Sequence, residues 1–234
     1  MQLLRKTLAP LLAVSILLLL MAGYCNIILG ETVKDLTIIK LPDPDRNGSV
    51  PLETTLHKRR SVRSFQETPL SLQAVSQLLW AVQGISDRRG YRTAPSAGAL
   101  YPLETYVIAD DVTDLKKGIY LYKPADHSLV LTREGDYLRM LSRAALRQDA
   151  VMLAPAVFVI AGIPSRTTGK YGERGIRYMY MESGHAAQNI SLQAVALDLG
   201  SVTIGAFTDD DVARIIKLEK SVSPLYIIPV GKAR

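Results

Sequence analysis

The sequence predicts an α+β domain in which helices pack against a β-sheet. Segments with the apolar spacing of strands and of helices alternate along the chain, but without the regular strand–helix–strand rhythm of a doubly wound parallel sheet. The composition, with 48% hydrophobic and 21% charged residues, is that of an ordinary globular protein. Once an apolar leader is set aside, roughly 180 to 190 residues remain, which suits one domain with a substantial core.

Residues 1–30 are expected to form an N-terminal signal or anchor segment. Arg5 and Lys6 precede an apolar run over residues 8–29, and about twenty apolar residues suffice to span a hydrocarbon core. A cleaved secretory signal and an uncleaved anchor compete, and we favour the anchor slightly. Because the positive residues lie at the amino end, we expect a membrane-anchored or exported protein whose folded domain is extracytoplasmic.

Residues 31–51 are polar and rich in turn-forming residues, which predicts a linker to a folded domain over residues 52–234. A first helix is expected from about Leu52 into the basic segment that follows. Ser71 has the character of an N-cap for a second helix, whose apolar residues recur at helical spacing until Gly84 stops it.

The middle of the domain predicts strands and one helix. Residues 103–109 have the composition of a strand, and residues 118–122 and 129–132 predict a hairpin across a polar turn. A helix over residues 136–147 then precedes an apolar strand at 156–163.

The last third of the chain contains the longest predicted helix, over residues 175–199. An extended segment at 201–206 follows it, and three aspartates after Thr208 favour the start of a short helix that ends near Leu218. Residues 226–230 predict a closing strand.

Composition excludes several classes of protein chemistry. The net charge is +6, but the basic residues form no long stripe interleaved with aromatic residues, so no nucleic-acid binding is expected. Cys25 is the only cysteine, which rules out an intrachain disulfide, an iron–sulfur cluster and a cysteine-based zinc site. His57, His127 and His185 lie far apart without metal-ligand spacing, so no metal site is expected. The reactivity therefore has to come from a cofactor.

Three short segments have the residue types that a cofactor site needs. The basic segment Arg59, Arg60, Ser61 and Arg63 can hold phosphate oxygens through guanidinium and hydroxyl donors, or it can be a solvated helix face. The small residues Pro95, Ser96, Ala97 and Gly98 can expose backbone N–H groups to a planar ligand, or they can be a tight connection. Ile204, Gly205 and Ala206 allow a similarly close approach, while no GxGxxG or Walker loop indicates a dinucleotide or triphosphate site.

Together these segments resemble the nitroreductase superfamily of flavin enzymes, and in particular its SagB/ThcOx-type branch of thiazoline and oxazoline oxidases. The strings that carry the resemblance are RRSVRSF, PSAGALYPLE, KYGERGIRY, GHAAQNISLQAVALDLGS and PVG. The resemblance implies a nitroreductase-like sandwich with a central, mostly antiparallel sheet flanked by helices. It also implies an FMN-dependent oxidoreductase that transfers two electrons, as a hydride, at flavin N5.

The same resemblance assigns roles to individual residues. It implies that Arg59, Arg60, Ser61 and Arg63 hold the FMN phosphate, with Lys232 and Arg234 as further candidates. It implies that Pro95 to Gly98 lie beside the flavin, often as part of the partner subunit, because such proteins are usually homodimers with FMN at the interface. Ile204, Gly205 and Ala206 would face the N5 side of the ring. Lys170 and Tyr171 resemble the general base and proton relay of the azoline oxidases.

The sequence leaves the reaction partners open. The substrate is expected to be a small molecule or a peptide, and the electron partner is either NAD(P)H or molecular oxygen. Two other interpretations remain, a membrane-tethered flavin-binding module without turnover and a cofactor-free relative whose arginines contact anionic lipid.

Overall fold

The computed structural model describes residues 37–234, and a seven-stranded sheet forms the middle of this unit. The strand order is β1-β4-β3-β2-β5-β7-β6, and every pair of neighbours is antiparallel. The strands are β1 (Ile38–Lys40), β2 (Leu103–Ala109), β3 (Gly118–Lys123), β4 (Ser128–Glu134), β5 (Ala156–Gly162), β6 (Gly200–Ser201) and β7 (Ser223–Gly231). This confirms the predicted α+β class with an antiparallel sheet.

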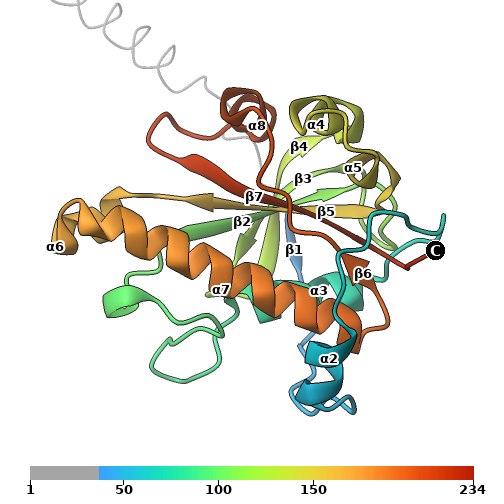
Figure 1. Cartoon of the computed structure of the whole chain (residues 1–234), viewed down its shortest axis with the longest axis horizontal. Coiled ribbons are helices and arrows are strands. Elements are labelled where there is room, and N and C mark those ends of the chain that lie inside the picture. The colour runs from blue at the N-terminus through green and yellow to red at the C-terminus, as the bar shows by residue number, and fades with distance from the viewer. Residues whose placement is uncertain (1–36) are drawn as a thin grey trace, which may run out of the picture. The chain divides into compact units, whose positions relative to one another are not determined.

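Helices cover both faces of the sheet, so that the unit has three layers (Figure 1). The helices are α2 (Leu52–Lys58), α3 (Leu72–Gln83), α4 (Leu138–Ala144), α5 (Asp149–Leu153), α6 (Ser165–Tyr171), α7 (Arg174–Ala196) and α8 (Asp209–Ile216), with a short 3-10 turn η1 (Ala97–Ala99). One core joins the sheet to α3 and α7, and the other joins it to α4, α5 and α8.

Strand β5 shows how the two cores share the sheet. All seven of its residues are buried. Because successive side chains of a strand point to opposite faces, Phe158 and Ile160 pack in the core under α3 and α7, whereas Val157 and Val159 pack under α4, α5 and α8. A continuous apolar run is what a strand covered on both faces requires.

Helix α3 begins where the sequence predicts. The Ser71 hydroxyl accepts a hydrogen bond from the Ala74 backbone N–H at 3.1 Å, and the helix ends at Gly84. Long helix α7 packs closely against the sheet because its inward residues are small, among them Ala186, Ala187 and Ala194. The segments that form the candidate site pack against α7.

The compact unit begins at Thr37 and not at residue 52. Strand β1 pairs with β4 within the predicted linker, Leu41 is buried, and its N–H donates to the His127 carbonyl at 3.1 Å. The turn-forming residues after Leu41 bend the chain over α3, where Asp45 and the Gln77 side chain exchange hydrogen bonds. Residues 37–51 are therefore part of the domain.

The predicted membrane-anchored or exported location requires correction. Within residues 37–234, no helix is both long enough and apolar enough to cross a membrane. The leader at residues 1–30, on which that prediction depended, lies outside the described residues. We therefore withdraw the prediction of an extracytoplasmic, membrane-anchored domain.

Candidate functional site

Three segments far apart in the sequence lie side by side at the end of α7 that leads into β6. The sequence predicts that the first helix continues into the basic segment. In the structure α2 ends at Lys58, and the chain is extended from Arg59 onward. The Val62 N–H donates to the Ser201 carbonyl at 2.9 Å, and the Arg234 N–H donates to the Ser64 carbonyl at 3.2 Å. The basic segment therefore lies between β6 and the C-terminal residues.

Close backbone approach makes this arrangement possible. A Cβ atom added at Gly200 would lie only 2.7 Å from the Val62 side chain. No residue larger than glycine fits at that position without displacing the basic segment. Gly200, which directly follows the predicted helix over residues 175–199, thus also sets the position of the phosphate candidates.

The cationic side chains of this cluster are available to an anion. Among residues 37–234, Arg59, Arg63 and Arg234 form no ion pair. The Arg60 guanidinium donates to its local backbone, to the carbonyls of His57 and Arg59. Lys232 is paired with Asp198, whose carboxyl pKa it lowers. Within the described part of the chain, three guanidinium groups therefore remain without an ion pair, and each presents the fork of donors that can bind phosphate oxygens.

The turn at residues 204–206 follows β6 and lies beside Ile227, in the middle of β7, whereas the cluster lies beside the C-terminal end of β7. Ile204 is buried and exchanges backbone hydrogen bonds with Ile227, at 2.9 and 3.0 Å. Gly205 and Ala206 are exposed. A Cβ added at Gly205 would meet only the Tyr226 ring, at 3.8 Å. A flat ligand can therefore approach the backbone of this turn closely.

The loop at residues 95–101 forms a second cluster with Lys170 and Tyr171. Gly98 has φ of 62°, and a Cβ added there would lie 2.7 Å from Tyr171 Oη and 3.0 Å from Lys170 Nζ. Both predicted catalytic side chains therefore reach the loop. They come from α6, a helix that the sequence analysis did not predict, and Lys170 is exposed. The Tyr171 ring packs edge to face on Tyr178, with 5.1 Å between centroids.

The two clusters lie at opposite ends of α7. Figure 1 shows α6 beside the beginning of α7, and α2 and β6 beside its end. A helix of 23 residues is about 34 Å long, which exceeds the length of a flavin mononucleotide. One chain therefore brings the phosphate candidates together with residues 204–206, and separately brings the loop together with Lys170 and Tyr171. It does not join the two clusters.

A buried polar network lies under the loop, and the sequence analysis missed it. Glu182 of α7 is 2% exposed, and its carboxylate accepts from the Gln83 side-chain amide at 3.4 Å. Burial raises the pKa of Glu182, while Ser96, Gln83 and Arg92 act to lower it. One signal could have revealed it, since Glu182 is the only Asp, Glu, Lys or Arg between residues 178 and 197.

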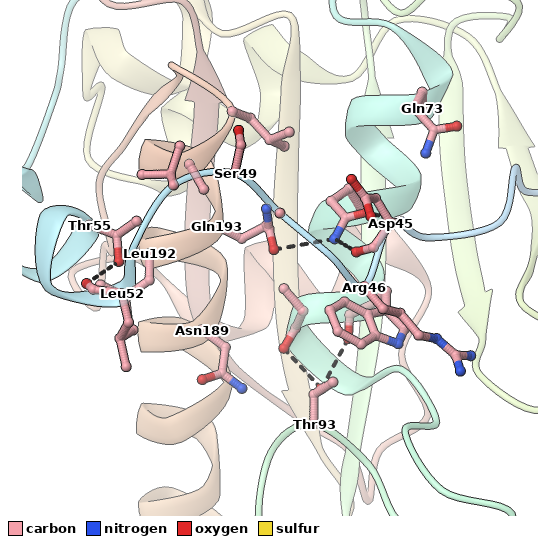
Figure 2. A pocket seen from close by; sticks show the side chains of 17 residues that line it. Asp45, Arg46, Ser49, Leu52, Thr55, Gln73, Thr93, Asn189, Leu192 and Gln193 are labelled. Carbon is pink, nitrogen blue, oxygen red and sulfur yellow. Dashed lines mark hydrogen bonds between the residues drawn. The ribbon is translucent and has the colours of Figure 1, made fainter.

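A hollow of the surface lies apart from both clusters, between α3 and α7 (Figure 2). Its volume is about 580 Å³, and residues 45–52 cross its edge. The Gln77 amide donates to the Asp45 carbonyl at 2.9 Å and to Gln193 Oε1 at 3.3 Å, so much of its polar lining is already paired. None of the predicted site residues lines this hollow.

An antiparallel sheet between two helix layers, with a cluster of arginines unpaired within residues 37–234 and a small-residue turn at its edge, defines the class of α+β protein. The Nitroreductase family matches residues 56–232. The chain belongs to the nitroreductase family, and this membership assigns it to the oxidoreductases.

Individual relatives agree with this assignment. The chain is 44% identical over 204 residues to MJ1384 of Methanocaldococcus jannaschii, a protein named as a nitroreductase, with 87% of this chain and 98% of that protein covered. The crystal structure of a nitroreductase from Ralstonia eutropha JMP134 is similar at a TM-score of 0.74 and 30% identity, over 84% of this chain and 90% of the other.

A third relative bears on the branch of the family. A chain of the Escherichia coli microcin synthetase McbBCD complex with truncated pro-MccB17 bound is similar at a TM-score of 0.66 and 25% identity. The similarity covers 83% of this chain and 78% of the other. It confirms the resemblance to the SagB/ThcOx-type branch.

Proposed function

We propose that the protein is an FMN-dependent oxidoreductase that acts on a small-molecule or peptide substrate. The observation that carries the proposal is the cluster of Arg59, Arg63 and Arg234, which have no ion pair within residues 37–234, near the open turn at Gly205. Bound FMN would supply two-electron chemistry, as a hydride at its N5 atom, while the protein supplies binding and orientation. The similarity to a microcin synthetase chain supports a peptide-derived substrate.

The residues of the two clusters divide the work in this proposal. Arg59, Arg63 and Arg234 hold the phosphate, with the Ser61 hydroxyl as a further donor. Gly205 admits the flat ring close to the backbone. Lys170 takes a proton from a substrate carbon at Nζ, and the Tyr171 hydroxyl beside it relays that proton.

The separation of the clusters supports a homodimer with each FMN shared between two chains. A second copy related by a twofold axis would place the loop of one chain against the phosphate cluster of the other. Exposed apolar side chains on α7 and α2 give such a contact its surface, namely Ile176, Tyr180, Met181, Leu52 and Leu56. Burying these side chains favours association.

The first test measures FMN binding after removal of the phosphate contacts. Each charge-assisted hydrogen bond contributes about 1.5 to 3 kcal/mol, so Arg59→Ala combined with Arg63→Ala should weaken FMN binding by at least about a hundredfold. Arg139→Ala with Arg143→Ala on α4 removes the same charge from an exposed helix and serves as the control. Flavin fluorescence quenching gives both affinities, and equal affinities would refute the phosphate assignment.

A second measurement separates an enzyme from a flavin-binding module without turnover. Flavin bound to the purified protein is mixed with NADH or NADPH without air, and its absorbance near the flavin bands is followed. Loss of that absorbance and its return on adding oxygen or a quinone support an oxidoreductase. Flavin that binds but stays oxidised with NADH, with NADPH and with a thiazoline- or oxazoline-containing peptide would support the module instead.

A further inference from the structure

A buried polar network supports the loop that carries Pro95 to Gly98. Glu182 Oε1 accepts a hydrogen bond from Gln83 Nε2, while Glu182 Oε2 is buried and has no hydrogen-bond partner among the described residues. Gln83 is 1% exposed, and its Oε1 accepts from Arg92 Nη1 at 2.7 Å. An amide group therefore links a buried carboxylate to a guanidinium group. A buried oxygen without a hydrogen-bond partner, such as Glu182 Oε2, is rare in proteins and calls for an explanation.

The network is in contact with the loop at both ends of the loop. The Arg92 guanidinium group lies over the Tyr101 ring, 4.4 Å from its centroid. The Arg92 backbone N–H donates to Tyr101 Oη at 3.2 Å. At the other end, the Ser96 hydroxyl accepts a hydrogen bond from the Tyr101 backbone N–H at 2.9 Å, and Ser96 acts to lower the pKa of Glu182. From outside, Arg166 donates to the Tyr101 carbonyl at 3.2 Å.

The loop needs such support because its backbone is strained. Ala99 and Tyr101 have φ of 53° and 47°, a region that residues other than glycine rarely adopt. Strained conformations persist only where the surroundings hold them, and they gather at functional sites. Here both strained residues closely follow Gly98, which lies against Lys170 and Tyr171.

We propose that Glu182 is a positioning residue that, through Gln83, Arg92 and Ser96, holds the strained loop 95–101 against Lys170 and Tyr171. This positioning of the loop requires neither bound flavin nor a second subunit. The consequence, a correctly placed flavin ring and proton path, rests on the proposed function. A residue that merely filled space could be replaced by an apolar one of similar volume at little cost.

The test therefore compares Glu182→Met, which keeps the volume, with Glu182→Gln, which keeps a hydrogen-bond acceptor. Hydrogen exchange of the full chain without flavin reports on the loop through the Tyr101 amide. Glu182→Met should speed exchange in peptides covering residues 95–101 by about tenfold or more, and Glu182→Gln should restore most of the protection. Ser191→Ala, which alters another buried polar residue of α7, is the control and should leave the loop as in wild type.

Loop exchange in Glu182→Met equal to that in wild type would overturn the proposal. If Glu182→Met fails to unfold cooperatively, Gln83→Met breaks the same link from α3, and it must give the same faster exchange. Equal exchange in that variant would also overturn the proposal.

Flavin provides the second readout. If the wild type binds FMN, Glu182→Met should lower its affinity and shift the absorbance of the bound flavin, while Ser191→Ala changes neither. Unchanged FMN affinity and an unchanged flavin spectrum in Glu182→Met would show that Glu182 does not affect the placement of the flavin ring. Faster loop exchange in a protein whose wild type binds no flavin would refute the proposed function and leave the positioning role standing.

Discussion

At Gly98 a single missing side chain joins two parts of the candidate site. The backbone there takes φ of 62°, and the space that a Cβ would need is occupied by the Tyr171 hydroxyl and the Lys170 ammonium group. Both features require glycine, the first because of the backbone and the second because of the neighbours. The same residue therefore controls loop conformation and the position of the predicted base.

Gly98→Ala separates these two effects when it is compared with Gly90→Ala. Gly90 also has positive φ, 85°, but a Cβ added there meets nothing within 4 Å. Each variant should lose about 1 to 2 kcal/mol of unfolding free energy in urea, from the backbone alone. Only Gly98→Ala should also slow steady-state turnover, by about tenfold, because Lys170 and Tyr171 must move away. Equal turnover in the two variants would show that the contact does not matter for the reaction.

Residue identity in the sequence revealed the exposed parts of the site better than the buried ones. The basic segment, the small-residue loop and Lys170 stand out because their residue types are unusual together. Glu182 is isolated among uncharged residues of its helix, but this signal alone does not indicate burial, because a glutamate in a helix is normally solvated. Only its burial and the neighbouring Gln83 and Arg92, which come from other segments, show that it belongs to the site.

Among the elements, those with strong local signals were predictable. Strand β2 at Leu103–Ala109 matches its prediction, and Ser71 caps α3 as expected. Strand β1 was missed because three residues before a run of prolines carry little pattern, and its pairing with β4 is a long-range contact. Helix α6 was missed because Gly169 and the polar residues around it lack an apolar stripe.

His127 ties the segment after β1 to two other elements. Its Nε2 lies 2.7 Å from Ser76 Oγ of α3 and 3.1 Å from the Pro42 carbonyl, and its Nδ1 lies 2.9 Å from Tyr122 Oη of β3. Burial lowers the pKa of His127, and Lys40 adds to the effect, while the Pro42 carbonyl and Asp43 oppose it. The folded structure thus favours the neutral imidazole more than the unfolded chain does.

This arrangement predicts a dependence of stability on pH. Because the folded pKa of His127 is below the unfolded value of about 6.5, the unfolded chain binds more protons below that pH. The stabilisation is therefore full above about pH 6.5 and declines as the pH falls toward the folded pKa. The difference in Tm between wild type and His127→Gln should narrow between pH 7.5 and 5.5. His57→Gln, at an exposed residue of α2, is the control, and a constant difference for His127→Gln would contradict the prediction.

At the scale of the whole molecule, the length of α7 decides what one chain can do. The phosphate cluster lies beside the end of α7 and the loop cluster beside its first half, and α7 as a whole is about 34 Å long. Sequence analysis could name the residues of both clusters, but not their separation, because distance across the fold depends on packing. In the proposed dimer, the phosphate cluster of each chain and the loop of its partner form one composite site, so the dimer has two such sites.

Composite sites predict complementation between two defective chains. Arg59→Ala with Arg63→Ala disables the phosphate cluster, and Ala97→Trp fills the loop with a bulky ring, so neither variant should bind FMN as a homodimer. In a heterodimer carrying a different tag on each chain, one of the two sites combines the intact halves. The doubly purified heterodimer should therefore hold FMN at about half of wild-type occupancy. Pairing the first variant with Lys232→Ala and Arg234→Ala is the control, because both chains then lack the phosphate half and no site is intact. Flavin absorbance per dimer measures the outcome, and an empty heterodimer in the first pairing would rule out a site shared between chains.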